Sequence, residues 1–298
     1  MAKDRNSIFL FVNLQHNKNK MEMEKQRGPI AVFDSGFGGL TILKDIVKAM
    51  PQYDYIYLGD NARTPYGTRS FETVYDFTLQ AVKQMFKMGS PLVILACNTA
   101  SAKALRSIQV RDLPTIDATR RVLGVIRPTV EAIGNLTKTG KVGVLGTTGT
   151  IQSQTYPLEV KKLFPDVEVF GQECPMFVPL VENSEYNSPG ADYFVKKYID
   201  ALMTQSPDID TVILGCTHYP VLEDKIRAAL PEGVNLILQG ELVAESLKDY
   251  LARHPEMEER CTKGGERVYL TTDSVEKFEN TAKIFMSDKV AANKITIE

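Results

Sequence analysis

The sequence predicts an α/β protein with two pseudo-symmetric, doubly wound domains, mainly parallel sheets and a site in the cleft between them. The first observation is that short apolar runs alternate with longer amphipathic stretches along the 298 residues. This alternation is typical of strands joined by crossover helices, which produce parallel sheets. The second observation is a repeated strand–turn–helix pattern, and the third is a cysteine that follows a similar apolar run in each half.

The predicted strands are short runs rich in β-branched and other apolar residues. Several are continuously apolar, as expected for strands that helices cover on both faces. In chain order they are Ile30–Phe33, Tyr55–Leu58, Leu92–Ala96, Lys141–Leu145, Val167–Phe170, Thr211–Gly215, Asn235–Leu238 and Arg267–Thr271. The amphipathic stretches between them predict helices over Leu40–Met50, Phe71–Met88, Pro157–Leu163, Tyr193–Thr204 and Leu242–Arg253.

A repeat divides the chain into two units. The segment IAVFDSGFGGLTIL at 30–43 has the pattern of a strand, a polar turn and a helix start, and VGVLGTTGTIQSQTY at 142–156 has the same layout. Duplication is the economical explanation, although chance similarity of two α/β units would give the same pattern. We expect residues 29–120 and 222–298 to form a first domain, residues 121–221 a second, and residues 1–28 a loosely ordered extension.

Composition and charge narrow the class of protein. Lys and Arg number 35 against 37 Asp and Glu, without a basic stripe, which argues against a nucleic-acid partner. No apolar run is long enough to cross a membrane, and no small-residue cleavage site follows the apolar stretch near the N-terminus. The 4 cysteines are too few for a disulfide scaffold. We expect a cytoplasmic protein with free thiols.

Polar residues follow several of the predicted strands. In open parallel sheets, ligands bind beyond the carboxyl ends of the strands. If two such sheet edges face each other, the cysteines in PLVILACNTA and TVILGCTHYP lie on opposite sides of one ligand. The residues at these strand ends are Asp34, Asp60, Cys97, Thr147 and Cys216.

Three kinds of chemistry use two facing thiols. A disulfide needs Cα atoms within about 7 Å and would fill the cleft. Zinc prefers three or four N/S ligands, whereas the chain has 3 histidines and no C-x-x-C pair, so zinc remains an alternative with little support. Proton transfer suits thiols better, because a reference pKa of about 8.5 lets one sulfur be a thiolate and the other a thiol. Such a pair on opposite faces of a stereocentre would invert its configuration.

Hydrogen-bonding groups surround both cysteines. In CNTAS, Asn98 and Thr99 offer an amide, a hydroxyl and backbone N–H groups at a predicted helix start, which suits a carboxylate. In CTHYP, Thr217 offers the same kind of group, and His218 can prepare the adjacent thiol for proton exchange.

The turn DSGFGG at 34–39 offers a carboxylate and a hydroxyl for an ammonium group. Asp34 and Ser35 are the residues concerned, and the glycines let the backbone approach a small ligand. This turn is not a dinucleotide fingerprint, because the third required glycine is replaced by Thr41. The sequence alone leaves pyridoxal phosphate open as a cofactor, but without a cofactor the two thiols can carry out the proton transfers themselves.

Five ordered motifs, DSGFGGLT, GDNARTPYG, CNTAS, CPMFVPLVE and LGCTHYP, resemble those of glutamate racemases of bacterial cell-wall synthesis. The similarity runs from about Pro29 to YLTTDSVEKF near the C-terminus. The resemblance implies interconversion of L- and D-glutamate without a cofactor or metal, two α/β domains, supply of D-glutamate for peptidoglycan and a homodimer as an assembly to test.

Matched positions imply roles for individual residues. Cys97 would act on the D-enantiomer and Cys216 on the L-enantiomer, with Asp34 and His218 as their auxiliaries. Glu182, which closes VPLVE, matches a further acidic residue near the site. Together with Asp34 and His218, the substrate contacts would be Ser35, Tyr66, Gly67, Asn98, Thr99, Thr150 and Thr217.

Two stretches depart from the family's pattern. The segment PTIDATRRVLGVIRPTVEAI is expanded, and LILQGELVAESL lacks the usual Asp-Ser before Gly-Glu. The alternatives to a glutamate racemase are the same site acting on aspartate or a related small acid, and a non-enzymatic amino-acid-binding module. We expect Cys174 and Cys261 to be buried structural cysteines.

Overall fold

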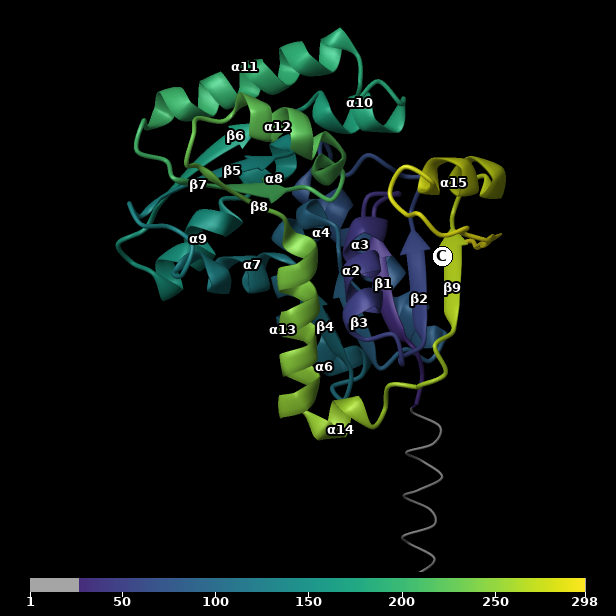
Figure 1. Ribbon diagram of the computed structural model, residues 1–298. Coiled ribbons are helices and arrows are strands. Elements are labelled where there is room, and N and C mark those ends of the chain that lie inside the picture. The colour runs from purple at the N-terminus through teal and green to yellow at the C-terminus, as the bar shows by residue number, and fades with distance from the viewer. Residues whose placement is uncertain (1–26, 298) are drawn as a thin grey trace, which may run out of the picture.

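The computed structural model describes residues 27–297, so the extension expected over residues 1–28 lies outside the described residues except for its last two. Figure 1 shows two units, each with a sheet between helices, and α13 running from one toward the far end of the other. All strand pairs of both sheets are parallel. The predicted α/β fold class is confirmed.

The two sheets divide the strands into a first and a second unit. The first unit has the order β10-β9-β2-β1-β3-β4, and the second has β6-β5-β7-β8. The strands are β1 (Ile30–Asp34), β2 (Tyr55–Gly59), β3 (Leu92–Leu95), β4 (Arg121–Gly124), β5 (Lys141–Gly146), β6 (Glu168–Glu173), β7 (Thr211–Gly215), β8 (Asn235–Ile237), β9 (Arg267–Thr271) and β10 (Ala292–Lys294). The central strands β1, β3 and β7 are buried throughout, which explains their nearly unbroken apolar sequences.

Helices cover the sheets and connect successive strands. They are α2 (Leu40–Ala49), α3 (Phe71–Lys87), α4 (Asn98–Lys103), α5 (Leu105–Ser107), α6 (Leu113–Ile116), α7 (Ile126–Ile133), α8 (Thr148–Gln152), α9 (Thr155–Leu163), α10 (Phe177–Glu182), α11 (Pro189–Gln205), α12 (Glu223–Ala229), α13 (Gln239–Arg253), α14 (Pro255–Glu258) and α15 (Val275–Ala282), with a π-helix η1 (Ile108–Asp112) and a 3₁₀ helix η2 (Tyr219–Leu222). In the described part of the chain, no helix is both long and apolar enough to span a membrane.

The structure extends some of the predicted helices at their N-terminal ends. The predicted helix at Tyr193–Thr204 belongs to α11, which begins at Pro189 because the Ser188 side chain accepts a hydrogen bond from the N–H of Ala191. Helix α13 begins at Gln239 rather than Leu242, directly after β8.

The chain crosses between the units later than the predicted boundaries at residues 121 and 222. Strand β4 pairs with β3 in the first sheet, so the first crossing lies in the segment that contains α7. Strand β8 pairs with β7 in the second sheet, so the return crossing lies between β8 and the start of α13. Both strands are three or four residues long, and such short runs do not indicate which sheet they join.

Candidate active site

A cavity of about 290 Å³ lies between the two units, at the carboxyl ends of β1, β3 and β7. All but two of the predicted site residues line it, namely Ser35, Tyr66, Gly67, Cys97, Asn98, Thr99, Glu182, Cys216, Thr217 and His218. Asp34 and Thr150, which were expected to touch substrate, lie behind this lining. A larger cavity of about 660 Å³ contains Cys216 but not Cys97. Of these two cavities, the smaller one gives both sulfurs access to one ligand.

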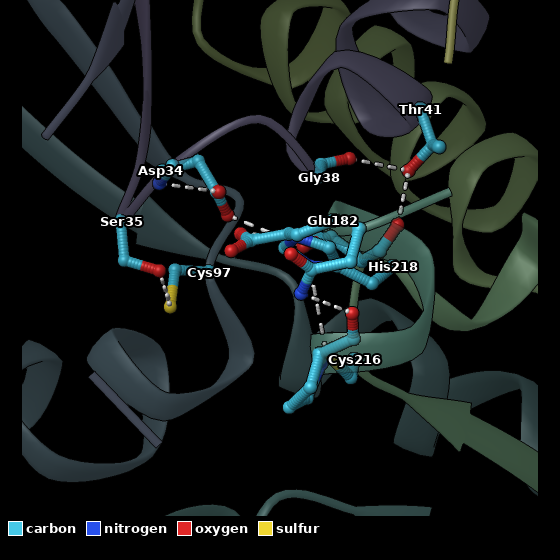
Figure 2. Close-up of polar contacts among 12 residues, drawn as sticks. Asp34, Ser35, Gly38, Thr41, Cys97, Glu182, Cys216 and His218 are labelled. Atoms are coloured by element: carbon cyan, nitrogen blue, oxygen red, sulfur yellow. Dashed lines mark hydrogen bonds and ion pairs between the residues drawn. The ribbon is translucent and has the colours of Figure 1, made fainter. Parts of the chain in front are cut away.

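Cys97 follows β3 and is the N-cap of α4. Its sulfur accepts a hydrogen bond from the N–H of Ala100 at 3.5 Å, and its thiol donates to Ser35 Oγ at 3.5 Å (Figure 2). Burial, and then the charge of Asp34, raise the pKa of Cys97 to about 12. These surroundings hold Cys97 as a neutral thiol.

Cys216 lies in a different electrostatic setting. Its sulfur is 3.9 Å from His218 Nδ1, and His218 Nε2 is 3.0 Å from Glu182 Oε1 (Figure 2). Burial opposes a charge on His218, but its contacts with Cys216 and Glu182 outweigh burial and raise the pKa of His218 to about 10. The arrangement favours a protonated His218 between the Cys216 sulfur and the Glu182 carboxyl group.

Asp34 is fully buried at the end of β1. Its Oδ2 accepts a hydrogen bond from the N–H of Gly36 at 2.9 Å, and its Oδ1 accepts from the hydroxyl of Thr217 at 3.3 Å. Burial raises the pKa of this carboxyl, against the lowering effects of His218 and of these hydrogen bonds. Asp34 therefore acts on the cavity indirectly, through its hydrogen bond with Thr217 and through its charge.

Tyr66 and Gly67 enter the cavity from the loop after β2. The hydroxyl of Tyr66 donates to Asp60 Oδ2, which also accepts from Arg63 Nε at 2.7 Å, while Thr272 donates to Asp60 Oδ1 at 2.9 Å. Burial and the Asp60 charge raise the pKa of Tyr66. The sequence predicts Asp60 at a strand end but indicates no role for it in the site. Its function in the structure is to fix this loop.

Threonine hydroxyls form the wall between the units. Thr99 Oγ1 lies 2.9 Å from Thr147 Oγ1 and 3.2 Å from Thr150 Oγ1, and Thr147 caps α8. Thr150 thus contacts its neighbours rather than the open cavity. The sequence predicts Thr147 at a strand end without a role in the site, because nothing in its local sequence shows that it faces Thr99.

Among residues 27–297, no group of three or more His, Cys, Asp and Glu side chains is arranged to hold a metal ion. Cys174 and Cys261 are buried free thiols, as expected, but Cys174 also lines the cavity.

Two units, each with a parallel sheet, thus place two thiols at one cavity. The model of the Asp/Glu/Hydantoin racemase family matches residues 38–247. A glutamate racemase from Jannaschia is 40% identical over 271 residues, covering 88% of this chain and 97% of the relative. The chain therefore belongs to the Asp/Glu/Hydantoin racemase family, and within it to the glutamate racemases.

Solved structures agree with this assignment. A glutamate racemase from Bacillus anthracis is 34% identical, with a TM-score of 0.82 and coverage of 91% of this chain and 98% of that one. A glutamate racemase from Francisella tularensis, solved in complex with D-glutamate, is 32% identical, with a TM-score of 0.81 and coverage of 92% and 99%.

Proposed function

We propose that this chain interconverts L- and D-glutamate by a two-thiol mechanism that needs no cofactor. The observation that carries the proposal is that Cys97 and Cys216, unlinked and buried, line one cavity from different units. We also propose that the two units act as two domains around this cavity.

The reaction begins with L-glutamate and the Cys216 thiolate. This thiolate removes the α-proton, and the neutral thiol of Cys97 delivers its own proton to the opposite face of the carbanion. The products are D-glutamate, a Cys216 thiol and a Cys97 thiolate, so the proton count balances. The reverse reaction starts from these swapped states.

The weak acidity of the α-hydrogen is the main barrier. The site lowers this energy barrier by placing hydrogen-bond donors and charges where negative charge develops. We assign this task to the hydroxyls and amide that line the cavity and to the imidazolium of His218. Asp34, behind Thr217, keeps negative charge near Cys97 and so disfavours an early loss of its proton.

The decisive experiment follows L-glutamate by circular dichroism in deuterated water without added cofactor. We expect loss of optical activity together with deuterium at the α-carbon, and no racemisation by Cys97→Ser or Cys216→Ser, because a serine hydroxyl is far less acidic. Cys261→Ser, at a buried thiol outside the cavity, is the matched control and should retain full activity. Wild-type racemisation by either of the first two variants would exclude the mechanism.

The same assay separates the alternatives. Faster exchange with aspartate than with glutamate would indicate the other substrate. Stabilisation by glutamate without any α-exchange would indicate a binding module. We expect exchange with glutamate, because the similar proteins carry that name.

The biological role that we propose is supply of D-glutamate for peptidoglycan. The support is the resemblance to enzymes of cell-wall synthesis, and the four free cysteines fit a reducing, cytoplasmic location. Depletion of the protein in its host should then stop growth unless D-glutamate is added. The homodimer remains a prediction, which light scattering on the purified protein tests.

A further inference from the structure

A closed ring of hydrogen bonds lies beside Cys97. Asn98 Nδ2 donates to Gln239 Oε1 at 2.6 Å, Gln239 Nε2 donates to the hydroxyl of Tyr156 at 2.9 Å, and that hydroxyl donates to Asn98 Oδ1 at 2.8 Å. All three side chains are at most 3% exposed. Polar groups buried this deeply require their partners, so the ring is held as a unit.

The ring stands where the chain crosses between the units. Gln239 is the first residue of α13, at the return crossing, while Asn98 begins α4 in the first unit and Tyr156 belongs to α9 in the second. Gln239 Nε2 also donates to Thr129 Oγ1 at 2.8 Å, and Thr129 lies in α7 at the first crossing. Figure 1 shows α4, α7 and the start of α13 in this region.

The contact with α7 fixes the direction of the ring. Thr129 donates its own hydroxyl proton to the carbonyl of Val125 at 2.8 Å, so its oxygen can only accept from Gln239. Gln239 must therefore turn its Nε2 toward α7 and its Oε1 toward Asn98. This orientation in turn sets which end of the Asn98 amide is the donor.

Asn98 retains one N–H after these contacts. Its Oδ1 accepts from Tyr156, and one Nδ2 proton goes to Gln239, which leaves the second Nδ2 proton for a ligand. Asn98 lines the cavity. A flipped amide would instead leave oxygen lone pairs there, which would repel a carboxylate.

We propose that Gln239 is a positioning residue, which holds the Asn98 amide so that it presents an N–H donor to a carboxylate of the bound amino acid. This inference rests on the proposed function, because the ligand is taken to be glutamate. Gln239 occupies the place where the sequence departs from the family's usual Asp-Ser, and it is 3% exposed itself. It acts through Asn98 and contacts no reacting atom.

The test is Gln239→Met, which keeps the length of the side chain and removes its donor and acceptor. Loss of one well-placed hydrogen bond to a charged ligand corresponds to about 10-fold weaker binding. We expect KM for glutamate to rise on the order of 10-fold while kcat changes little, because the contact is made in ground and transition states alike. Calorimetric binding of D-glutamate should weaken by the same factor.

A double mutant distinguishes positioning from general support of the fold. In an Asn98→Ala background, Gln239→Met should change KM by less than about twofold, since its target is already gone. An equal rise in both backgrounds would overturn the inference. Tyr55→Phe is the matched control, because it removes a buried hydroxyl that donates to Met50 O, at the other end of the sheet, and KM should not move.

Two outcomes separate this inference from the proposed function. If the wild-type protein does not racemise glutamate, the proposed function fails. If the wild-type protein racemises glutamate but Gln239→Met keeps its KM within twofold, only the positioning role fails. Should Gln239→Met not fold, Tyr156→Phe opens the same ring by removing a single oxygen, and an unchanged KM there overturns the inference.

Discussion

The two thiols have similar sequence surroundings but opposite electrostatic ones. Cys97 faces the buried carboxylate of Asp34, which disfavours a second negative charge, whereas Cys216 faces an imidazole whose other nitrogen is held by Glu182. A two-base racemase needs one sulfur in each protonation state. Burial and the Asp34 charge favour the thiol form of Cys97, so under the proposed mechanism Cys216 is the sulfur that removes the first proton from L-glutamate.

Replacement of His218 tests this asymmetry. With a pKa of about 10, His218 stays protonated across the neutral range, and under the proposed mechanism its charge stabilises negative charge on the Cys216 sulfur. His218→Asn removes that charge, so we expect the rate at pH 8 to fall by about 10² or more and to recover partly as pH rises. Initial rates in both directions between pH 6 and 10 measure this. His254→Asn, at a histidine outside both cavities, is the control, and an unchanged pH profile for His218→Asn contradicts the assignment.

Replacement of Asp34 should separate stability from activity. Burial raises the pKa of the Asp34 carboxyl, so ionisation of this group destabilises the folded protein. This destabilisation is absent below pH 3.8 and is complete once the pH exceeds the raised pKa. Asp34→Asn should therefore raise the free energy of unfolding at pH 7 by about 1 kcal/mol, with the gain vanishing toward pH 4. Racemisation should fall at least about 10-fold.

Asp210 provides a control of opposite sign for that measurement. Hydrogen bonds led by that from Thr137 outweigh burial and lower the pKa of Asp210 to about 2. Its carboxylate contributes stability above pH 3.8, which is lost as the pH falls through 2. Asp210→Asn should therefore destabilise the protein at pH 7. Urea unfolding at a series of pH values measures this effect. A loss of stability for Asp34→Asn at pH 7 would contradict our account of its burial.

At the scale of elements, the turn before α2 is pressed against the loop after β7. The hydroxyl of Thr41 is shared between Gly38 O at 2.9 Å and Thr217 O at 3.2 Å, which joins the two units at this point. A Cβ on Gly38 would lie 2.3 Å from Thr217 Oγ1 and 2.5 Å from His218 Nδ1. Glycine is therefore required here by close approach rather than by backbone angles.

Gly38→Ala should displace the loop that carries Cys216 and His218. We expect activity to fall by about 10- to 100-fold, since small misplacements of catalytic groups are costly, and stability to fall by about 1–3 kcal/mol from overpacking. Gly190→Ala is the matched control, because the nearest atom to its added methyl is Ser188 Oγ at 3.4 Å. Rates and thermal melts of both variants decide the question, and wild-type activity of Gly38→Ala would refute the role of this contact.

Elements with strong local patterns are predictable from the sequence, and those set by distant partners are not. The central strands and the cysteines at their ends follow from continuous apolar runs and turn residues. The edge strands β4 and β10 contain charged or polar residues and owe their pairing to β3 and β9. For a similar reason the sequence does not reveal the roles of three polar residues, because the partner of each comes from another element. The pairs are Asp60 with Tyr66, Thr147 with Thr99, and Gln239 with Asn98.

At the scale of the whole molecule, the cavity is closed by contacts that cross between the units. The N–H of Gly149 donates to Gly67 O at 2.7 Å, and the hydroxyl of Thr155 donates to Ala102 O at 3.1 Å. The ring of Asn98 and Tyr156 crosses the same boundary. A ligand between the units therefore adds contacts to both and should stabilise their closed arrangement.

Gly67→Ala tests whether this closure is coupled to binding. A Cβ at Gly67 would lie 2.8 Å from Thr147 Cβ, so the loop after β2 and the start of α8 must separate. Glutamate at 100 times its Kd should stabilise the wild-type protein by about 2.7 kcal/mol. A 10-fold weaker Kd in the variant would reduce that gain by about 1.4 kcal/mol.

The measurement is thermal unfolding of wild type, Gly67→Ala and Gly190→Ala over a series of glutamate concentrations. Without ligand, Gly67→Ala should melt close to the wild type, because relief of the clash requires the units to part rather than unfold. With ligand, its melting temperature should rise less steeply, while Gly190→Ala follows the wild type. A strained contact within one unit would instead lower the melting temperature equally at every glutamate concentration. Equal ligand dependence of Gly67→Ala and wild type would show that binding does not require the approach of Gly67 to Thr147.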